Sequence, residues 1–77
     1  MDAKKVSTLR KRLGLTQAEM ARAIGSSTMV ISHWENGFRV PQAITARFLS
    51  LLYSLSDSEL ARISKRLQTL SEEDSDA

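Results

Sequence analysis

Four uncharged side chains at helical spacing stand out as able to contact an external ligand: Thr28, Met29, Ser32 and His33. They are spaced i, i+1, i+4 and i+5, so at about 100° per residue they share one side of a helix. Ile31 and Trp34 fall on the opposite side. A solvated helix surface usually carries Lys, Glu and Arg, whereas this side offers donors, acceptors and methyl groups without formal charge.

Two short helices joined by a tight turn are predicted to position this face. Thr16 and Glu19 form a capping-box pattern that opens the first of them. Gly25 ends that helix because glycine readily adopts positive φ. Ser26 and Ser27 are both competent N-caps for the helix that carries the four residues, and this helix extends to about Asn36-Gly37. A join this short forces the axes to cross steeply, which predicts a helix-turn-helix over residues 16–36.

Three further helices complete the predicted fold. The first follows the face formed by Val6, Leu9 and Leu13 and ends at Gly14. Another spans roughly 41–54, with Pro41 in its first turn. Its apolar residues are Ile44, Phe48, Leu51, Leu52 and Leu55. The last opens with a capping box at Ser56–Glu59 and carries Leu60, Ile63, Leu67 and Leu70. With no strand pattern, the chain reads as one compact all-α domain over residues 1–70.

Charge and composition narrow the function classes. Residues 1–47 hold eight basic and three acidic side chains, a net charge of +5, whereas residues 48–77 carry −3. This asymmetry suggests a polyanionic partner, although ordinary solvated charge gives the same count. The acidic segment 71–77 is predicted to be disordered. No apolar run exceeds three residues and no cysteine occurs, so we expect a soluble, cytoplasmic protein without a membrane span or disulfides.

The uncharged face suits the edges of DNA bases. The major groove presents hydrogen-bonding groups and the thymine methyl, and phosphate contacts would come from the residues around the face. The alternative is that the helix pair binds nothing, as in many small helical domains.

A longer pattern connects the chain to a known family. Leu15-Thr16-Gln17-x-Glu19-Met20-Ala21-x-x-Ile24-Gly25, then Ser27, then Ile31-Ser32-x-Trp34-Glu35-Asn36-Gly37-x-Arg39-x-Pro41 resembles the Cro/C1-type (XRE) helix-turn-helix family of bacterial and phage DNA-binding regulators. The resemblance covers about residues 6–55. It implies a five-helix, lambda-repressor-like domain. It also implies a homodimer that reads a near-palindrome in double-stranded DNA with its third helix in the major groove.

The resemblance also implies roles for individual residues. The base-facing set would be Ser27, Thr28, Met29, Ser32 and His33. Phosphate contacts would come from Thr16, Gln17, Asn36, Gly37 and Arg39. Arg10 and Glu35 match a pair that in family members forms an internal ion pair, so Arg10 is expected to be structural. Lys4, Lys5, Lys11 and Arg12 either line the DNA-facing rim or are simply solvated.

The sequence departs from the family pattern in two places. One affects which bases are recognised, and the other affects which partner protein is expected. Many members place Gln or Arg where Thr28 and Met29 stand, and neither residue here can make a bidentate hydrogen bond. Discrimination would then depend on thymine methyls, on His33 or on DNA shape. The fourth helix is more like the MqsA/HigA-type antitoxin branch. The alternative function is therefore an antitoxin-like subunit that neutralises a toxin and autoregulates its operon.

Dimerisation is expected because a single small DNA-binding domain contacts only one half-site of the DNA. The residues predicted at a two-fold interface are Leu52, Leu55, Leu60, Ile63 and Leu67. The alternative is that the leucine stripe of the fifth helix closes the core. No cofactor or small-molecule ligand is expected, and a lone His without Cys argues against a metal site. No catalytic constellation of Ser, His and acid occurs, which argues against an enzyme.

Overall fold

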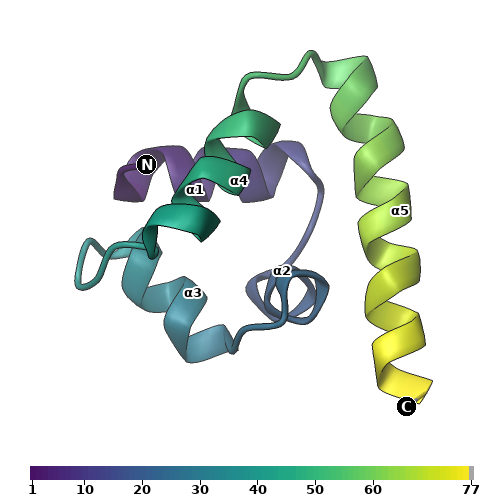
Figure 1. Cartoon of the computed structure of the whole chain (residues 1–77), viewed down its shortest axis with the longest axis horizontal. Helices are drawn as coiled ribbons and strands as arrows, with labels where there is room; N and C mark the ends of the chain where they lie inside the picture. Colours follow the sequence, from purple (N-terminus) through teal and green to yellow (C-terminus); the bar gives the residue numbers. More distant parts are fainter. Residues whose placement is uncertain (77) are drawn as a thin grey trace.

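The computed structural model describes the backbone of residues 1–76 and the side chains of residues 1–70. The described chain consists of five helices without a strand, in agreement with the all-α prediction (Figure 1). They are α1 (Ala3–Arg12), α2 (Gln17–Ile24), α3 (Thr28–Glu35), α4 (Ala43–Tyr53) and α5 (Asp57–Asp76). In Figure 1, α4 crosses in front of α1, α3 lies below them, and α5 stands along one side.

Local side-chain chemistry sets the ends of α2. The Thr16 hydroxyl accepts from the Glu19 backbone N–H at 3.1 Å, and the Thr16 N–H donates to the Glu19 carboxylate at 2.8 Å. Gly25 ends the helix in the left-handed region at φ +74°, where a side chain would be strained. The same reciprocal capping joins Ser56 and Glu59 at the start of α5. Both predicted capping boxes are confirmed.

The start of α4 differs from the prediction by two residues. The helix begins at Ala43, with Gln42 as an extended N-cap residue at ψ 159°. Pro41 is buried ahead of the helix and does not occupy its first turn. Outside the helix the missing proline N–H removes no helical hydrogen bond.

The core lies between helices that cross rather than run parallel. α1 packs on α3 and α4, and α2 packs on α3 and α5. Side chains with no more than 1% exposure come from all five helices: Val6, Leu9, Met20, Ile31, Leu49 and Leu60. Trp34 is 8% exposed and belongs to the same cluster. The core therefore fixes the orientation of α3 through α1 and α2.

The apolar residues of α4 lie on two different sides of the helix, one buried and one exposed. The sequence analysis treated them as one set. Leu49 and Leu52 are buried, whereas Ile44, Phe48 and Leu51 are exposed by 80, 40 and 61%. The exposed three follow one another at spacings of four and three. At about 100° per residue, Leu49 lies about 100° and Leu52 about 40° around the helix from Phe48. We call Ile44, Phe48 and Leu51 the α4 stripe; half-buried Leu55 lies beyond the end of α4 and packs against the core.

The residues predicted at a two-fold interface differ in their exposure within a single chain. Leu52, Leu60 and Leu67 are 3, 1 and 8% exposed within a single chain, so they offer almost no surface to a second copy. The reason is that α5 turns back along α2 and closes the core with its own stripe. Of the five predicted residues, only Leu55 and Ile63 keep partial exposure.

Two polar anchors hold the start of α5 against α1. The Ser64 hydroxyl, buried in the contact, donates to the Leu13 carbonyl at the end of α1 over 2.5 Å. The Arg12 guanidinium donates to the Tyr53 and Leu55 carbonyls at 3.0 and 2.8 Å. It also pairs with the exposed Asp57 carboxylate at 2.9 Å. Arg12 therefore satisfies carbonyls that the end of α4 leaves without helical partners.

The segment 71–77, which is predicted to be disordered, forms the far end of α5 as far as Asp76. Helical backbone continues to Asp76, and no glycine or proline interrupts the segment. The side chains of 71–77 lie outside the described residues. Within the described part of the chain, no helix is both long and apolar enough to cross a membrane.

Candidate nucleic-acid interface

The outer side of α3 is accessible, and its inner side holds the helix in place. Ile31 and Trp34 are buried, whereas Thr28 is exposed and Met29 is 67% exposed. Ser32 and His33 on the same outer side are half-buried. Ser27 precedes the helix, and its hydroxyl accepts from the Val30 N–H at 3.2 Å. The structure thus brings the predicted base-facing set together on one side of a short, firmly packed helix.

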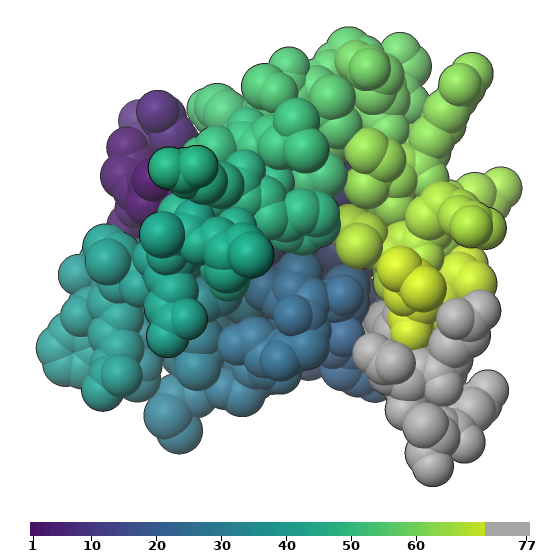
Figure 2. Space-filling model, in the orientation of Figure 1, coloured from purple at the N-terminus to yellow at the C-terminus, as the bar shows by residue number. Residues whose placement is uncertain are grey.

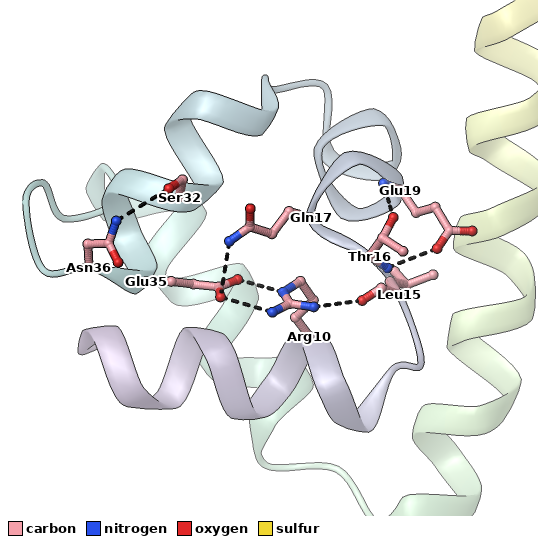
Figure 3. A network of polar contacts seen from close by, with 8 residues as sticks. All are labelled: Arg10, Leu15, Thr16, Gln17, Glu19, Ser32, Glu35 and Asn36. Atoms are coloured by element: carbon pink, nitrogen blue, oxygen red, sulfur yellow. Dashed lines mark hydrogen bonds and ion pairs between the residues drawn. The ribbon is translucent and has the colours of Figure 1, made fainter.

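Beside this face, an ion pair links α1 to the end of α3 (Figure 3). The Arg10 Nε and Nη2 atoms donate to the two Glu35 carboxylate oxygens at 2.6 and 3.0 Å. Arg10 also donates to the Leu15 carbonyl at 3.0 Å. The two charged side chains are only 16 and 9% exposed. The structure therefore contains the Arg10–Glu35 pair, and Arg10 has a structural role.

Gln17 joins the same network from the first turn of α2. Its Nε2 atom lies 3.4 Å from a Glu35 oxygen, and Figure 3 shows its side chain pointing toward that carboxylate. The contact uses one of the two amide hydrogens, so the second hydrogen and the carbonyl oxygen remain for another partner. Sequence reasoning placed Gln17 at the interface but missed this contact, because it joins residues 18 positions apart.

The network also sets the charge state of Glu35. Hydrogen bonds from Arg10 hold the pKa of the Glu35 carboxyl below its ordinary value, against the opposing effect of partial burial. The same hydrogen bonds raise the pKa of the Arg10 guanidinium. The pair is therefore fully ionised at neutral pH, and α3 is tied to α1 by a charge-assisted, two-pronged contact.

The chain after α3 folds back onto the end of that helix. Gly37 adopts φ +75°, which favours glycine. The Phe38 and Arg39 backbone N–H groups then both donate to the His33 carbonyl, at 2.9 and 3.2 Å. Asn36 Nδ2 donates to the Ser32 hydroxyl at 3.3 Å. The predicted phosphate-contacting residues of this segment are therefore held directly beside the outer side of α3.

Phe38 is an exposed aromatic residue beside His33 that the sequence analysis did not consider. Its side chain is 78% exposed, and its ring meets the His33 ring at 5.3 Å between centroids and 77° between planes. A large aromatic residue between Gly37 and Pro41, in a turn that cannot bury it, was the available signal.

The basic residues of α1 divide into two groups. Arg12 is taken up by the carbonyls at the end of α4, so it is not available to line the rim. Lys4, Lys5 and Lys11 are exposed, and Lys5 Nζ lies 5.8 Å from the centroid of the Tyr53 ring. Among the described side chains, no three His, Cys, Asp or Glu residues converge on a possible metal position.

A steeply crossing helix pair, a glycine turn between its members and an outward polar face on the second helix decide the class of this protein. The chain belongs to the Cro/C1-type helix-turn-helix family. The family described as helix-turn-helix matches residues 6–60, which cover most of α1, all of α2 to α4 and the start of α5. Neither the curated proteins nor the solved structures contain a match to the chain. Members of the family are DNA-binding transcription regulators, and this chain is one of them.

Proposed function

We propose that the protein is a sequence-specific, homodimeric repressor that places the outer side of α3 in the major groove. The observation that carries this proposal is the contrast between the two sides of α3. Its inner side is buried against α1 and α2, and its outer side presents uncharged groups with accessible flanks. Base edges in the major groove are the nucleic-acid surface that such a face fits.

The proposed phosphate contacts flank this face on both sides. Gln17 and Thr16 lie at the start of α2, where unpaired backbone N–H groups favour an anion. Asn36, Gly37 and Arg39 lie beyond the other end of α3, and the Arg39 side chain is exposed. Because these residues contact the DNA backbone, they set the position of α3 rather than the bases that it reads.

Selection of duplexes from a random library tests the proposal directly. We expect purified protein to enrich two inverted half-sites about one helical turn apart, centre to centre. A protein that enriches no sequence over random DNA would contradict the proposal.

Salt dependence tests the phosphate contacts. Removing one phosphate contact lowers the slope of log K against log salt by about one. We expect the slope measured with the selected duplex to be less steep by about one for Arg39→Ala than for the wild type. Arg62→Ala is the matched control, because it removes the same charge from the exposed surface of α5. Equal slopes for the two variants would remove Arg39 from the interface.

The second copy of the chain is proposed to pack on the α4 stripe. Its three side chains are exposed, and the only charged residue of α4 is Arg47. Apolar residues at alternating spacings of four and three are the pattern that two helices bury against each other. A neighbouring apolar groove extends this surface, lined by Ala23, Ile24, Ile44, Thr45, Phe48, Leu67 and Leu70. In Figure 2, α4, α2 and α5 meet on the near face of the molecule.

The small size of this surface favours a dimer that forms fully only on DNA. Stable interfaces bury about 800 Å² per partner, and a few exposed side chains supply less. Sedimentation velocity, with and without a duplex carrying both half-sites, checks this. We expect Ile44→Ser and Leu51→Ser to weaken self-association and Ala61→Ser, on exposed α5 surface, to leave it unchanged. If only one chain binds a duplex that carries both half-sites, the dimer is excluded. The α4 stripe would then be a binding surface for a different protein, such as a toxin.

Repression is the regulatory direction proposed from the family resemblance. A dimer bound over a promoter would exclude RNA polymerase. Transcription in vitro from a promoter that overlaps the selected site is expected to fall as protein is added. An increase in transcript would assign the protein as an activator.

A further inference from the structure

The outer side of α3 has hydroxyl groups that stay close to the helix. The Ser27 hydroxyl accepts from the Val30 N–H, and the Ser32 hydroxyl accepts from Asn36 Nδ2. Each keeps a proton that it can donate, but a serine side chain held by such a bond extends little beyond the helix surface. These two residues therefore reach base edges less readily than their neighbours.

Two large side chains near them are apolar and exposed, Met29 and Phe38. Met29 is 67% exposed in the first turn of α3, and it has no hydrogen-bond donor and only a weak acceptor. Its flexible thioether adapts to irregular apolar surfaces. Met29 can therefore read a base only by van der Waals contact.

Phe38 extends the apolar surface past the other end of the helix. Its backbone N–H is bonded to the His33 carbonyl, and its ring packs edge-on against the His33 ring. This double contact fixes Phe38 next to a base-facing residue while leaving 78% of the side chain exposed. An aromatic side chain held in that position can contact an apolar group in the groove.

We infer that Met29 and Phe38 determine specificity by contacting the C5-methyl groups of thymines in the major groove. The thymine methyl is the apolar group that distinguishes base pairs there. This inference rests on the proposed function and names the chemistry that its half-sites contain. Each half-site carries a thymine opposite Met29 and a second one opposite Phe38.

Replacing thymine by deoxyuridine in the selected duplex, one position at a time, is the direct test. This change removes one methyl group and preserves every hydrogen-bonding group of the base. Burial of one methyl corresponds to roughly a three- to fivefold change in affinity. We expect such a loss for the wild-type protein at two positions in each half-site, measured by fluorescence anisotropy at fixed salt.

Variants assign each position to its residue. Met29→Ala is expected to bind the thymine and deoxyuridine duplexes equally at the first position, and Phe38→Ala at the second. Val40→Ala is the matched control, because Val40 is a 76% exposed apolar residue of the same connecting segment. This control should keep the thymine preference at both positions. All three side chains are exposed, so the variants should retain the wild-type melting temperature.

The outcomes separate this inference from the proposed function. A protein that selects a site yet binds thymine and deoxyuridine duplexes equally would overturn the inference and leave the function standing. A thymine preference that persists in both Met29→Ala and Phe38→Ala would also overturn it. Failure to select any site would instead contradict the proposed function.

Discussion

Glu35, the last residue of α3, receives two hydrogen bonds from Arg10 of α1. The contact spans 25 positions and holds two charges that are at most 16% exposed. Gln17 reaches the same carboxylate from α2 at 3.4 Å. One acidic side chain thus couples three helices behind the proposed DNA-reading face.

Removing only one partner of this pair should be strongly destabilising. We expect Glu35→Ala to lower the free energy of unfolding by about 3 kcal/mol, because it leaves the Arg10 charge poorly solvated. The double variant Arg10→Met/Glu35→Leu should recover most of that loss, because it removes both charges. Urea denaturation measures both values. A double variant as unstable as Glu35→Ala would show that the pair itself contributes the stability.

Acid should destabilise the protein in a window set by its lowered carboxyl pKa values. Hydrogen bonds from Arg10 lower the pKa of Glu35, and capping hydrogen bonds at Thr16 and Ser56 lower those of Glu19 and Glu59. A carboxyl whose pKa is lower in the folded state adds stability above its unfolded value, near 4.3, and loses it as the pH falls through the folded value.

Melting temperatures between pH 7 and pH 2 check this dependence. The melting temperature should be nearly constant above about pH 5 and fall at lower pH. Glu35→Gln should show a smaller fall than the wild type, since the residue no longer titrates. Identical acid profiles would show that Glu35 does not contribute to the linkage.

Arg12 is predicted to stabilise the attachment of α5. Arg12→Met removes two hydrogen bonds to the carbonyls of Tyr53 and Leu55. We expect a loss of about 1–3 kcal/mol, mainly from the unsatisfied carbonyls. The contact with Asp57 adds little, because that side chain is 93% exposed. Hydrogen exchange should accelerate at the start of α5, whereas the exposed neighbour Lys11→Met should leave exchange unchanged.

One leucine of α5 lies in the core, and one leucine of α4 lies on the surface. Leu60 is 1% exposed and Leu51 is 61% exposed. Leu60→Ala should cost about 2–5 kcal/mol through the cavity it creates. Leu51→Ala should change stability by less than about 0.5 kcal/mol at concentrations where the protein is monomeric. Equal effects in thermal denaturation would contradict the assignment of Leu51 to the α4 stripe.

The features that sequence predicted well are local ones. The capping boxes at Thr16 and Ser56 and the glycine turn at Gly25 depend on residues within four positions of each other. The inner side of α3 was also predictable, because Ile31 and Trp34 are its large apolar residues at helical spacing. Their burial leaves the opposite side of the helix outside, so the predicted base-facing set lies on one side.

The orientation of α4 could not be predicted, because this helix has two apolar sides. Leu49 and Leu52 compete with Phe48 and Leu51 for the core, and hydrophobicity does not distinguish them. The choice is made by the packing of α4 on α1 and by the return of α5 along α2. Phe38 was missed for a related reason, since its contact with His33 depends on how the segment after Gly37 folds back.

The eight residues of α3 lie between two glycines in the left-handed conformation, Gly25 and Gly37. An inserted or deleted residue within this helix would rotate everything after it by about 100°. Trp34 would then leave the core, and the Glu35 carboxylate would turn away from Arg10. The segment therefore tolerates exchange of its outward side chains but no change in length. New DNA preferences in descendants of this chain should arise by substitution at positions such as Met29, within a helix of constant length.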